Sequence, residues 1–345
     1  MINCRNMISN DDVSEIIMKK ISILIPCYNE SANIADLYTA ITKEINKFNN
    51  YEWEMIFEDN NSTDNTVELL RNLTIKDKRV RIIVNLANYG PERSSCNLFL
   101  SPCADAVICM CADLEDPPSL IPQFLEAWEN GWRVALGKYM KREENLLIHC
   151  CRRLYYRVIA GFSDVKIEKN VTGFGLYDIS VVDEIRKLEE YSFNGRFLCA
   201  ELGYPIKYIP YDKPKRQGGK SSYSLLRYYR TAVDYLVMTS HAPLHLASLI
   251  GFIISICSLL VALYYFIQKL LYWYTFEMGL APLIIGMFFL SGVQLFFVGV
   301  LGEYLSSAIK RLQHRPYVIE KERINFEGYD EPGKPKRNEE EIKGK

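Results

Sequence analysis

Short apolar runs alternate with helical patterns in the first half of the chain. The runs lie at residues 21–26, 55–57, 80–84, 106–110 and 133–136, and each is short enough for a buried strand. After the first run, apolar residues recur at helical spacing, beginning with Ile34 and Leu37. Strands that alternate with helices are joined by right-handed crossovers into a parallel sheet. The pattern therefore predicts an α/β domain with a mainly parallel sheet over residues 21–222, after a polar extension at residues 1–20.

Two long uncharged runs follow at residues 244–267 and 280–302. Each is about the length that crosses a hydrocarbon core of roughly 30 Å, so they predict two transmembrane helices; two buried core helices are the alternative. Residues 223–240 place apolar side chains on one face and charges elsewhere. This pattern predicts an interfacial amphipathic helix in the plane of the headgroups, with a core helix of the soluble domain as the alternative.

Basic residues flank the outer ends of the two runs, with Arg230 before them and Lys310 and Arg311 after them. Because such flanks stay in the cytoplasm, we expect a multi-pass protein of the cytoplasmic (inner) membrane. The α/β domain and both termini are then cytoplasmic, and the short linker 268–279 lies on the far side. Residues 303–345 are expected to form a charged cytoplasmic tail.

Composition indicates which partners the protein can attract and whether its cysteines are reduced. The 345 residues carry a formal net charge of -1, so no general field attracts nucleic acid. Ten cysteines are scattered without a pair of CxxC motifs, and no secretory signal is recognised at the N-terminus. We therefore expect reduced thiols and no zinc site of the paired type.

Three carboxylates follow the fourth apolar run: Asp113, Glu115 and Asp116, just before two prolines. Open α/β sheets bind ligands at the carboxyl ends of their strands. Asp113 and Glu115 can share one hard divalent cation, Mg²⁺ or Mn²⁺, with the phosphates of a substrate. The alternative is a solvated acidic cap on the next helix.

Two common phosphate-binding motifs are missing from the sequence. The first strand is followed by Pro26-Cys27-Tyr28-Asn29-Glu30-Ser31, which lacks the glycines of a dinucleotide fold. No G-x-x-x-x-G-K-[ST] occurs either. A divalent cation on Asp113 is therefore the economical way to neutralise phosphate charge.

Five motifs occur in an order that marks a family. They are Ile25-Pro26-Cys27-Tyr28-Asn29-Glu30, Glu58 to Thr66 in place of D-D-G-S-x-D-G-T, Asn88-Tyr89-Gly90, Ala112 to Pro118, and Gly302-Glu303-Tyr304-Leu305 leading to Arg315-Pro316-Tyr317. Over roughly residues 20–320 the chain resembles the family 2 glycosyltransferases of the GT-A fold. Within them it is most similar to the polyprenyl-phosphate glycosyltransferases, of the dolichol-phosphate-mannose-synthase and bacterial prenyl-phosphate glucosyltransferase type.

The resemblance implies roles for individual residues. Pro26, Tyr28, Glu30, Asp59 and Ala112 would line the site of a nucleotide-diphosphate sugar. Asp113 would bind the Mg²⁺ or Mn²⁺ that bridges the two phosphates. For the residues after the first two strands, the alternative is an ordinary turn that caps the next helix.

The chain departs from the family pattern at two places. The usual D-x-D begins with aspartate, where this chain has Cys111, and a common glutamine is replaced by Glu115. A thiol suits a hard cation poorly, so we expect Cys111 to pack and Glu115 to join the metal shell. Gly173 stands where many relatives have a catalytic aspartate, which leaves Asp178 as a candidate base. A lipid phosphate needs little help from a base, because it is mostly dianionic at neutral pH.

A basic, glycine-containing segment precedes the membrane runs and resembles the family's R-x-x-G-x-S-K, with Arg216, Gly219 and Ser221 matching. Lysine comes early, at Lys220. Arg216 and Lys220 are expected to bind the lipid phosphate and the diphosphate during catalysis. General attraction to anionic lipids is the alternative.

The resemblance thus implies an inverting, metal-dependent hexosyltransferase that uses a nucleotide-diphosphate sugar, UDP-glucose first, and polyprenyl (undecaprenyl) phosphate at the cytoplasmic membrane face. A membrane glycosyltransferase with a glycan acceptor and a non-catalytic nucleotide-sugar-binding membrane protein stay as alternatives. The identity of the sugar and the oligomeric state, including a homo-oligomer, are left open.

Overall fold

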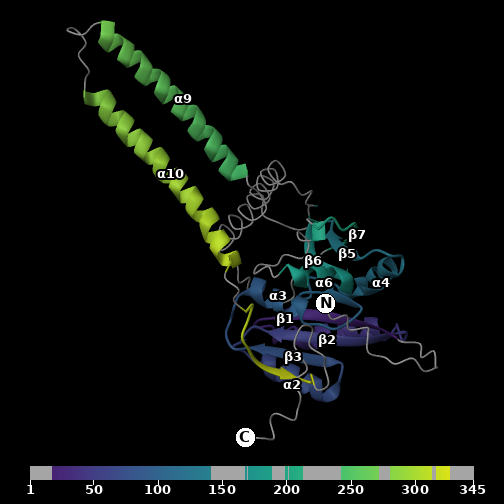
Figure 1. The fold of residues 1–345 in the computed structure, drawn as a ribbon. Coiled ribbons are helices and arrows are strands. Elements are labelled where there is room, and N and C mark those ends of the chain that lie inside the picture. The colour runs from purple at the N-terminus through teal and green to yellow at the C-terminus, as the bar shows by residue number, and fades with distance from the viewer. Residues whose placement is uncertain are drawn as a thin grey trace, which may run out of the picture. The chain divides into compact units, whose positions relative to one another are not determined.

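The computed structural model describes residues 18–140, 168, 170–188, 199–200, 202–212, 242–271, 280–312 and 316–326. These residues belong to two compact units. One unit contains the sheet together with residues 316–326, and the other contains the two long C-terminal helices. Figure 1 labels the helices and strands of each unit.

The first unit is built on an eight-stranded sheet in the order β7-β5-β6-β4-β1-β2-β3-β8. Pairing is parallel between β1 and β2, β1 and β4, β2 and β3, and β5 and β7. Only β6 and β8 run the other way. The strands are β1 (Lys19–Cys27), β2 (Tyr51–Asp59), β3 (Val80–Asn85), β4 (Ala106–Cys109), β5 (Val134–Tyr139), β6 (Val171–Asp178), β7 (Ile206–Tyr211) and β8 (Glu320–Ile324).

Helices cover both faces of this sheet. The face that carries Ile23 and Phe57 packs against α1 (Ile34–Ile45), α2 (Thr66–Lys76) and α4 (Ile121–Glu129), which follows the short turn η1 (Pro118–Leu120). The face that carries Leu24 and Ile56 packs against α3 (Pro91–Leu100) and α6 (Ile179–Lys187). The strands alternate apolar side chains between two buried layers, so the parallel core reads as nearly continuous apolar runs.

The five predicted strands and their mainly parallel order are confirmed, and β2 is longer than its apolar centre. The description of residues 303–345 as a charged tail was wrong in part. Residues 320–324 form β8, which pairs with β3 at the edge of the sheet. Arg71 and Glu322 form an ion pair across this junction, and the Arg93 guanidinium donates to the carbonyl oxygens of Pro316 (2.9 Å) and Tyr317 (2.7 Å).

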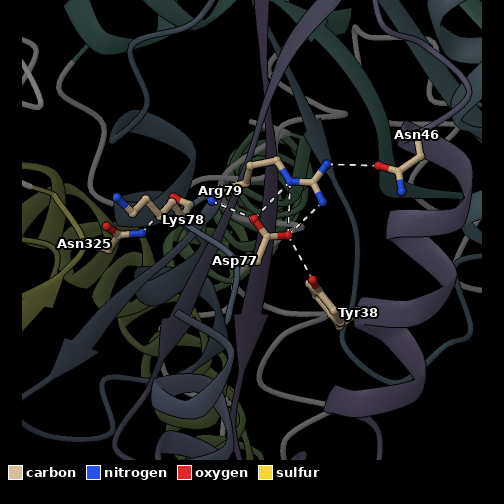
Figure 2. Close-up of polar contacts among 6 residues, drawn as sticks. All are labelled: Tyr38, Asn46, Asp77, Lys78, Arg79 and Asn325. Carbon is tan, nitrogen blue, oxygen red and sulfur yellow. Dashed lines mark hydrogen bonds and ion pairs between the residues drawn. The ribbon is translucent and has the colours of Figure 1, made fainter. Parts of the chain in front are cut away.

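A polar network holds the amino end of β3 (Figure 2). The Asp77 carboxylate accepts hydrogen bonds from the Tyr38 hydroxyl (2.9 Å) and from the Arg79 guanidinium (2.8 Å to Nη2). The amide of Asn325 donates to the carbonyl oxygens of Lys78 and Val80 at 2.7 and 2.8 Å. Asn325, just after β8, and Tyr38 of α1 are thus both tied by hydrogen bonds to the amino end of β3.

The second unit contains α9 (Ala242–Leu271) and α10 (Leu280–Leu312). Within them Ser248–Gln268 and Phe289–Ser306 are long and apolar enough to cross a membrane, and neither stretch is buried. The helix α10 continues ten residues beyond residue 302, where the second predicted membrane segment ends. The predicted amphipathic helix at 223–240 lies outside the described residues.

Candidate functional site

Six strands of the sheet end at one edge, which we call the carboxyl edge. It is marked by the last residues of β1, β2, β3, β4, β5 and β7: Cys27, Asp59, Asn85, Cys109, Tyr139 and Tyr211. The antiparallel strand β6 begins at this edge, because Gly175 pairs with Cys109 and Val171 with Lys138. Polar residues that follow the strands therefore gather along one line, as expected for a ligand site in an open sheet.

The turns after β1 and β2 are tied together. The backbone N–H of Asn29 donates to Ser62 Oγ at 2.9 Å, and the backbone N–H of Thr63 donates to Asn29 Oδ1 at 2.8 Å. The backbone N–H of Glu30 donates to Thr66 Oγ1 at 3.0 Å. Asn29 and Asn61 adopt left-handed backbone angles, with φ of 55° and 61°. Asparagine tolerates this conformation better than most residues. The two loops form one preorganised wall of the carboxyl edge.

The left-handed Asn61 also fixes how the D-D-G-S-x-D-G-T motif lies on the chain. A glycine in that motif fits the positive φ of Asn61, so the motif runs from Asp59 to Thr66 and Glu58 precedes it. Asp59 is then its first acid, and Asn60 stands in the place of the second. The predicted stretch from Glu58 to Thr66 thus contains the motif, with Glu58 as an additional residue before it.

Asp59 is fully buried, and only one of its two carboxylate oxygens accepts a hydrogen bond among the described residues. Its Oδ2 accepts the Ser62 N–H at 2.9 Å, whereas Oδ1 has no hydrogen-bond partner among the described residues. Burial raises the pKa of this carboxyl above its usual range. A buried acceptor without a donor costs free energy, so Asp59 Oδ1 is the atom of this wall that would gain most from a further donor.

Asn60 organises the next loop along the edge. Its Oδ1 accepts the Tyr89 N–H at 3.0 Å, and its Nδ2 donates to Asn88 Oδ1 at 3.1 Å. Asn88 Oδ1 in turn accepts the Gly90 N–H at 2.9 Å. The Asn88-Tyr89-Gly90 motif is thus held against the end of β2.

Behind this edge Glu58 is completely buried on the opposite face of β2. Its carboxylate accepts hydrogen bonds from Asn85 Nδ2 (2.8 Å), Ser94 Oγ (2.7 Å) and Asn97 Nδ2 (3.1 Å). Desolvation outweighs these donors and, with the nearby charge of Glu320, raises the pKa of Glu58 to about 7. Glu58 supports the strand that carries Asp59 but does not belong to the wall of the site.

Residues 111–116 form a tight acidic loop after β4. Asp116 is 2% exposed, and its Oδ2 accepts the Cys111 N–H at 3.0 Å. Asp113 Oδ1 accepts the Glu115 N–H at 3.1 Å. Between them Leu114 has a φ of 60°, a left-handed conformation that leucine rarely adopts. Cys111 is exposed, so the expectation that its side chain packs was wrong.

The donor set of this loop fits a hard cation only in part. Asp113 is partly exposed, and its Oδ2 accepts no hydrogen bond within the described ranges. However, no group of three His, Cys, Asp or Glu side chains that could hold a metal comes together among the residues the structure describes. A cation held by Asp113 and Glu115 would need further oxygen ligands, such as those of a diphosphate.

The other predicted site residues are spread between the carboxyl edge and regions outside it. Pro26 is the penultimate residue of β1, and Tyr28, just past the end of that strand, is 38% exposed. Glu30 Oε2 accepts the Asn33 side-chain amide at 2.6 Å. Ala112 is buried. Arg216 and Lys220 lie outside the described residues.

Asp178 is a correction. It pairs with Ala106 at the amino end of β4, the end of the sheet opposite to the acidic loop. Its carboxylate caps α6 through the Ser180 N–H (2.9 Å) and accepts the Trp128 indole N–H (2.8 Å). Asp178 is therefore a helix cap and not a base for this site. Gly173, by contrast, lies toward the carboxyl edge, and a Cβ there would meet nothing within 4 Å.

Three residues of the edge had no assigned role in the sequence. Asn60 lies inside the predicted motif, where an asparagine in place of an acid gave no signal of its own. Asp116 was read as part of an acidic cluster, although the two prolines after it could have suggested a fixed loop end. Tyr211 gave no sequence signal; its hydroxyl lies 3.5 Å from Asp116 Oδ1, so β7 reaches the acidic loop.

Comparisons with known proteins agree with this architecture. The family model described as "Glycosyl transferase family 2" matches residues 22–182. The glycosyltransferase YkcC of Bacillus subtilis (strain 168) is 30% identical over 304 residues, which cover 87% of this chain and 93% of that protein. The bactoprenol glucosyl transferase of Shigella phage SfV is 29% identical, over 88% of this chain and 99% of its own.

Among solved structures, S. aureus TarS 1-349 in complex with UDP-GlcNAc is a distant match, with a TM-score of 0.43 and 15% identity over 64% of this chain and 66% of that one. The family model covers the acidic loop and most of the sheet, and YkcC matches this chain over nearly its whole length. The chain is therefore a glycosyltransferase of GT-A fold that belongs to glycosyl transferase family 2.

Proposed function

We propose that this protein transfers one hexose, with inversion, from a uridine-diphosphate sugar to polyprenyl phosphate at the cytoplasmic face of a membrane. The observation that carries the donor half is the pairing of two features at one edge of the sheet: the buried, unpartnered Asp59 Oδ1 and the partly exposed Asp113. A nucleotide sugar needs a polar anchor for its base and charge compensation for its diphosphate, and these residues can supply both.

The state of Asp59 favours uracil over guanine. One carboxylate oxygen is used by the Ser62 N–H, so a single acceptor is left for the base. Uracil offers one ring N–H, at N3, with carbonyl groups on both sides. Guanine presents two adjacent donors, N1–H and the N2 amino group, which a carboxylate pairs with through both oxygens. UDP-glucose therefore remains the first candidate donor.

Charge compensation for the diphosphate is assigned to the acidic loop. Asp113, with Glu115 beside it, would hold Mg²⁺ or Mn²⁺ whose remaining ligands come from the two phosphates. Such a cation stabilises the negative charge that develops on the departing nucleoside diphosphate. Pro26, Tyr28, Glu30 and Ala112 would line the nucleoside pocket, and Arg216 and Lys220 would bind the phosphate of the acceptor.

The proposal that polyprenyl phosphate is the acceptor is supported by the names of relatives and by the chemistry of a phosphate nucleophile. Several relatives that match almost over their full length are named bactoprenol glucosyl transferases. An oxygen of a phosphate dianion can attack the anomeric carbon while the bond from that carbon to the diphosphate oxygen breaks. No proton has to be removed from this nucleophile. The reaction is thus compatible with Gly173 in place of an acid.

The apolar, unburied stretches of α9 and α10 support a membrane location. We place the α/β domain and both termini on the cytoplasmic side because of the basic flanks.

The test uses membranes that contain the full chain, a panel of labelled nucleotide sugars and extraction into organic solvent. We expect label in the lipid phase with UDP-glucose, little with GDP-mannose, and none for Asp113→Asn. Asp183→Asn, a change on the exposed side of α6, is the matched control and should retain transfer. Label that stays in the aqueous phase with every donor would reject a lipid acceptor.

A further inference from the structure

The acidic loop is held in a conformation that its sequence does not favour. Leu114 has the left-handed φ of 60° between Asp113 and Glu115, and no glycine or asparagine eases this position. A strained turn of this kind persists only where its surroundings fix it. The contacts that fix it must therefore come from residues next to the loop or from a neighbouring strand.

Asp116 provides the contact that closes the loop. Its buried carboxylate takes the Cys111 N–H at 3.0 Å, so the backbone is fastened on both sides of Leu114. Ordinary solvent exposure would make such a bond weak, but at 2% exposure the anchor is shielded from water. The carboxylate of Asp116 is thus committed inside the protein while that of Asp113 is partly exposed.

Tyr211 supports Asp116 from a strand distant in the sequence. The hydroxyl lies 3.5 Å from Asp116 Oδ1, longer than an ordinary O–H···O bond of about 2.8 Å. Its ring is fixed more firmly: a Cβ on Gly137 would come within 2.9 Å of Tyr211 Cε1, and the Phe174 ring packs edge-on at 5.8 Å. Glycine at 137 leaves room for the tyrosine to stand against the acidic loop.

We propose that Asp116 is a positioning residue for this glycosyltransferase, and that with Tyr211 it holds the 111–116 loop so that Asp113 meets the cation bound by the diphosphate. Asp116 contacts neither substrate nor cation; it acts through the backbone of the loop. This inference rests on the proposed metal role of Asp113.

The experiment measures UDP binding to the full chain in detergent as Mn²⁺ is titrated, by calorimetry, without any sugar transfer. Asp116→Asn should raise the Mn²⁺ concentration for half-maximal UDP binding by about 5- to 10-fold, because the Cys111 N–H then donates to a neutral amide oxygen in place of a charged carboxylate. Tyr211→Phe should raise it by about 2- to 3-fold, because only a long hydrogen bond is lost. UDP binding without metal should stay within about 2-fold of the unchanged protein for both variants, a range that the usual scatter of independent sites allows.

Tyr51→Phe is the matched control, because the Tyr51 hydroxyl also donates to a carboxylate, Glu129, but from the amino end of β2. It should leave the Mn²⁺ dependence unchanged. A merely structural role for Asp116 would lower thermal stability and weaken UDP binding equally with and without metal, which would overturn the proposal. If Asp116→Asn fails to fold, Tyr211→Phe decides alone, and an unchanged Mn²⁺ midpoint rejects the inference.

Failure of the inference is distinguishable from failure of the proposed function. If UDP binding by the unchanged protein does not depend on Mn²⁺, and Asp113→Asn does not change UDP binding, both the metal role of Asp113 and the positioning role of Asp116 are refuted. If Asp113→Asn abolishes the Mn²⁺ response while Asp116→Asn and Tyr211→Phe preserve its midpoint, only the positioning role is refuted.

Discussion

At the scale of single residues, the two oxygens of Asp59 have different surroundings. One is satisfied by the Ser62 N–H, and the other is buried without a donor in the described structure. In Asp59→Asn the side-chain oxygen can still accept from Ser62, but an NH₂ group would face the N–H of the base. We expect UDP affinity to fall by about 10- to 100-fold, the cost of losing a hydrogen bond to a charged group. Calorimetry with Asp183→Asn as control measures it, and an unchanged affinity would remove Asp59 from the base pocket.

Gly173 offers a test of whether the reaction needs a base. Nothing lies within 4 Å of a Cβ built there, and its φ is not in the left-handed region, so Gly173→Asp should fold normally. With a dianionic acceptor the added carboxylate gives no benefit, and its charge should leave transfer unchanged or lower it by up to about 10-fold. A rise of more than about 10-fold in the rate of lipid labelling, within the range of general base catalysis, would mean that a base was missing.

Single residues also show where sequence reasoning succeeds and fails. The position of Asp113 at the carboxyl edge could be predicted, because it comes shortly after an apolar strand. Asp178 could not be excluded, since only the antiparallel pairing of β6 with β4 moves it to the opposite end of the sheet. The roles of Asp116 and Tyr211 depend on a contact across 95 positions, which no local pattern encodes.

At the scale of elements, five of the six parallel strands were predictable, whereas the half-exposed parallel strand β7 and the antiparallel strands were not. Strands buried on both faces give apolar runs that stand out in the sequence. The strand β8 reads Glu320-Lys321-Glu322-Arg323-Ile324, which looks like a solvated tail. It is a strand because β3 offers it a free edge and because Asn97 and Arg71 pair with its glutamates. Such pairing between distant segments is invisible to local periodicity.

Glu58 gives the sheet a dependence on pH. Its pKa is about 7 in the folded protein against a usual value of 4.5, so the folded state binds the proton more tightly than the unfolded chain. Its contribution to stability is therefore complete below about pH 4.5 and is lost as pH rises through about 7. The loss is on the order of 3 kcal/mol, since each pKa unit corresponds to about 1.4 kcal/mol.

We therefore expect the melting temperature of the full chain in detergent to fall between pH 5 and pH 8, and Glu58→Gln to flatten this fall. The comparison concerns the slope with pH, because the amide also changes the hydrogen bonds with Asn97 at every pH. Equal slopes for the two proteins would show that Glu58 does not titrate in this range.

At the scale of the whole molecule, the chain combines an α/β unit of GT-A fold with two long apolar helices. The proposed topology places residues 272–279 outside the cytoplasm and the sheet unit inside. A membrane-impermeant maleimide should label Thr275→Cys in intact cells, whereas the exposed Cys111 should react only after the membrane is opened. Labelling of Cys111 in intact cells would show that the sheet unit lies outside the cytoplasm, which would contradict the proposed topology.

The central claim is that the acceptor is a lipid phosphate, and the most direct measurement compares two acceptors that differ only in that group. The purified full chain is incubated with labelled UDP-glucose and either undecaprenyl phosphate or undecaprenol, and the organic phase is counted. We expect label with the phosphate, none with the alcohol, and none with either for Asp113→Asn. Transfer to the alcohol at a comparable rate, or no lipid label from the phosphate, would contradict it.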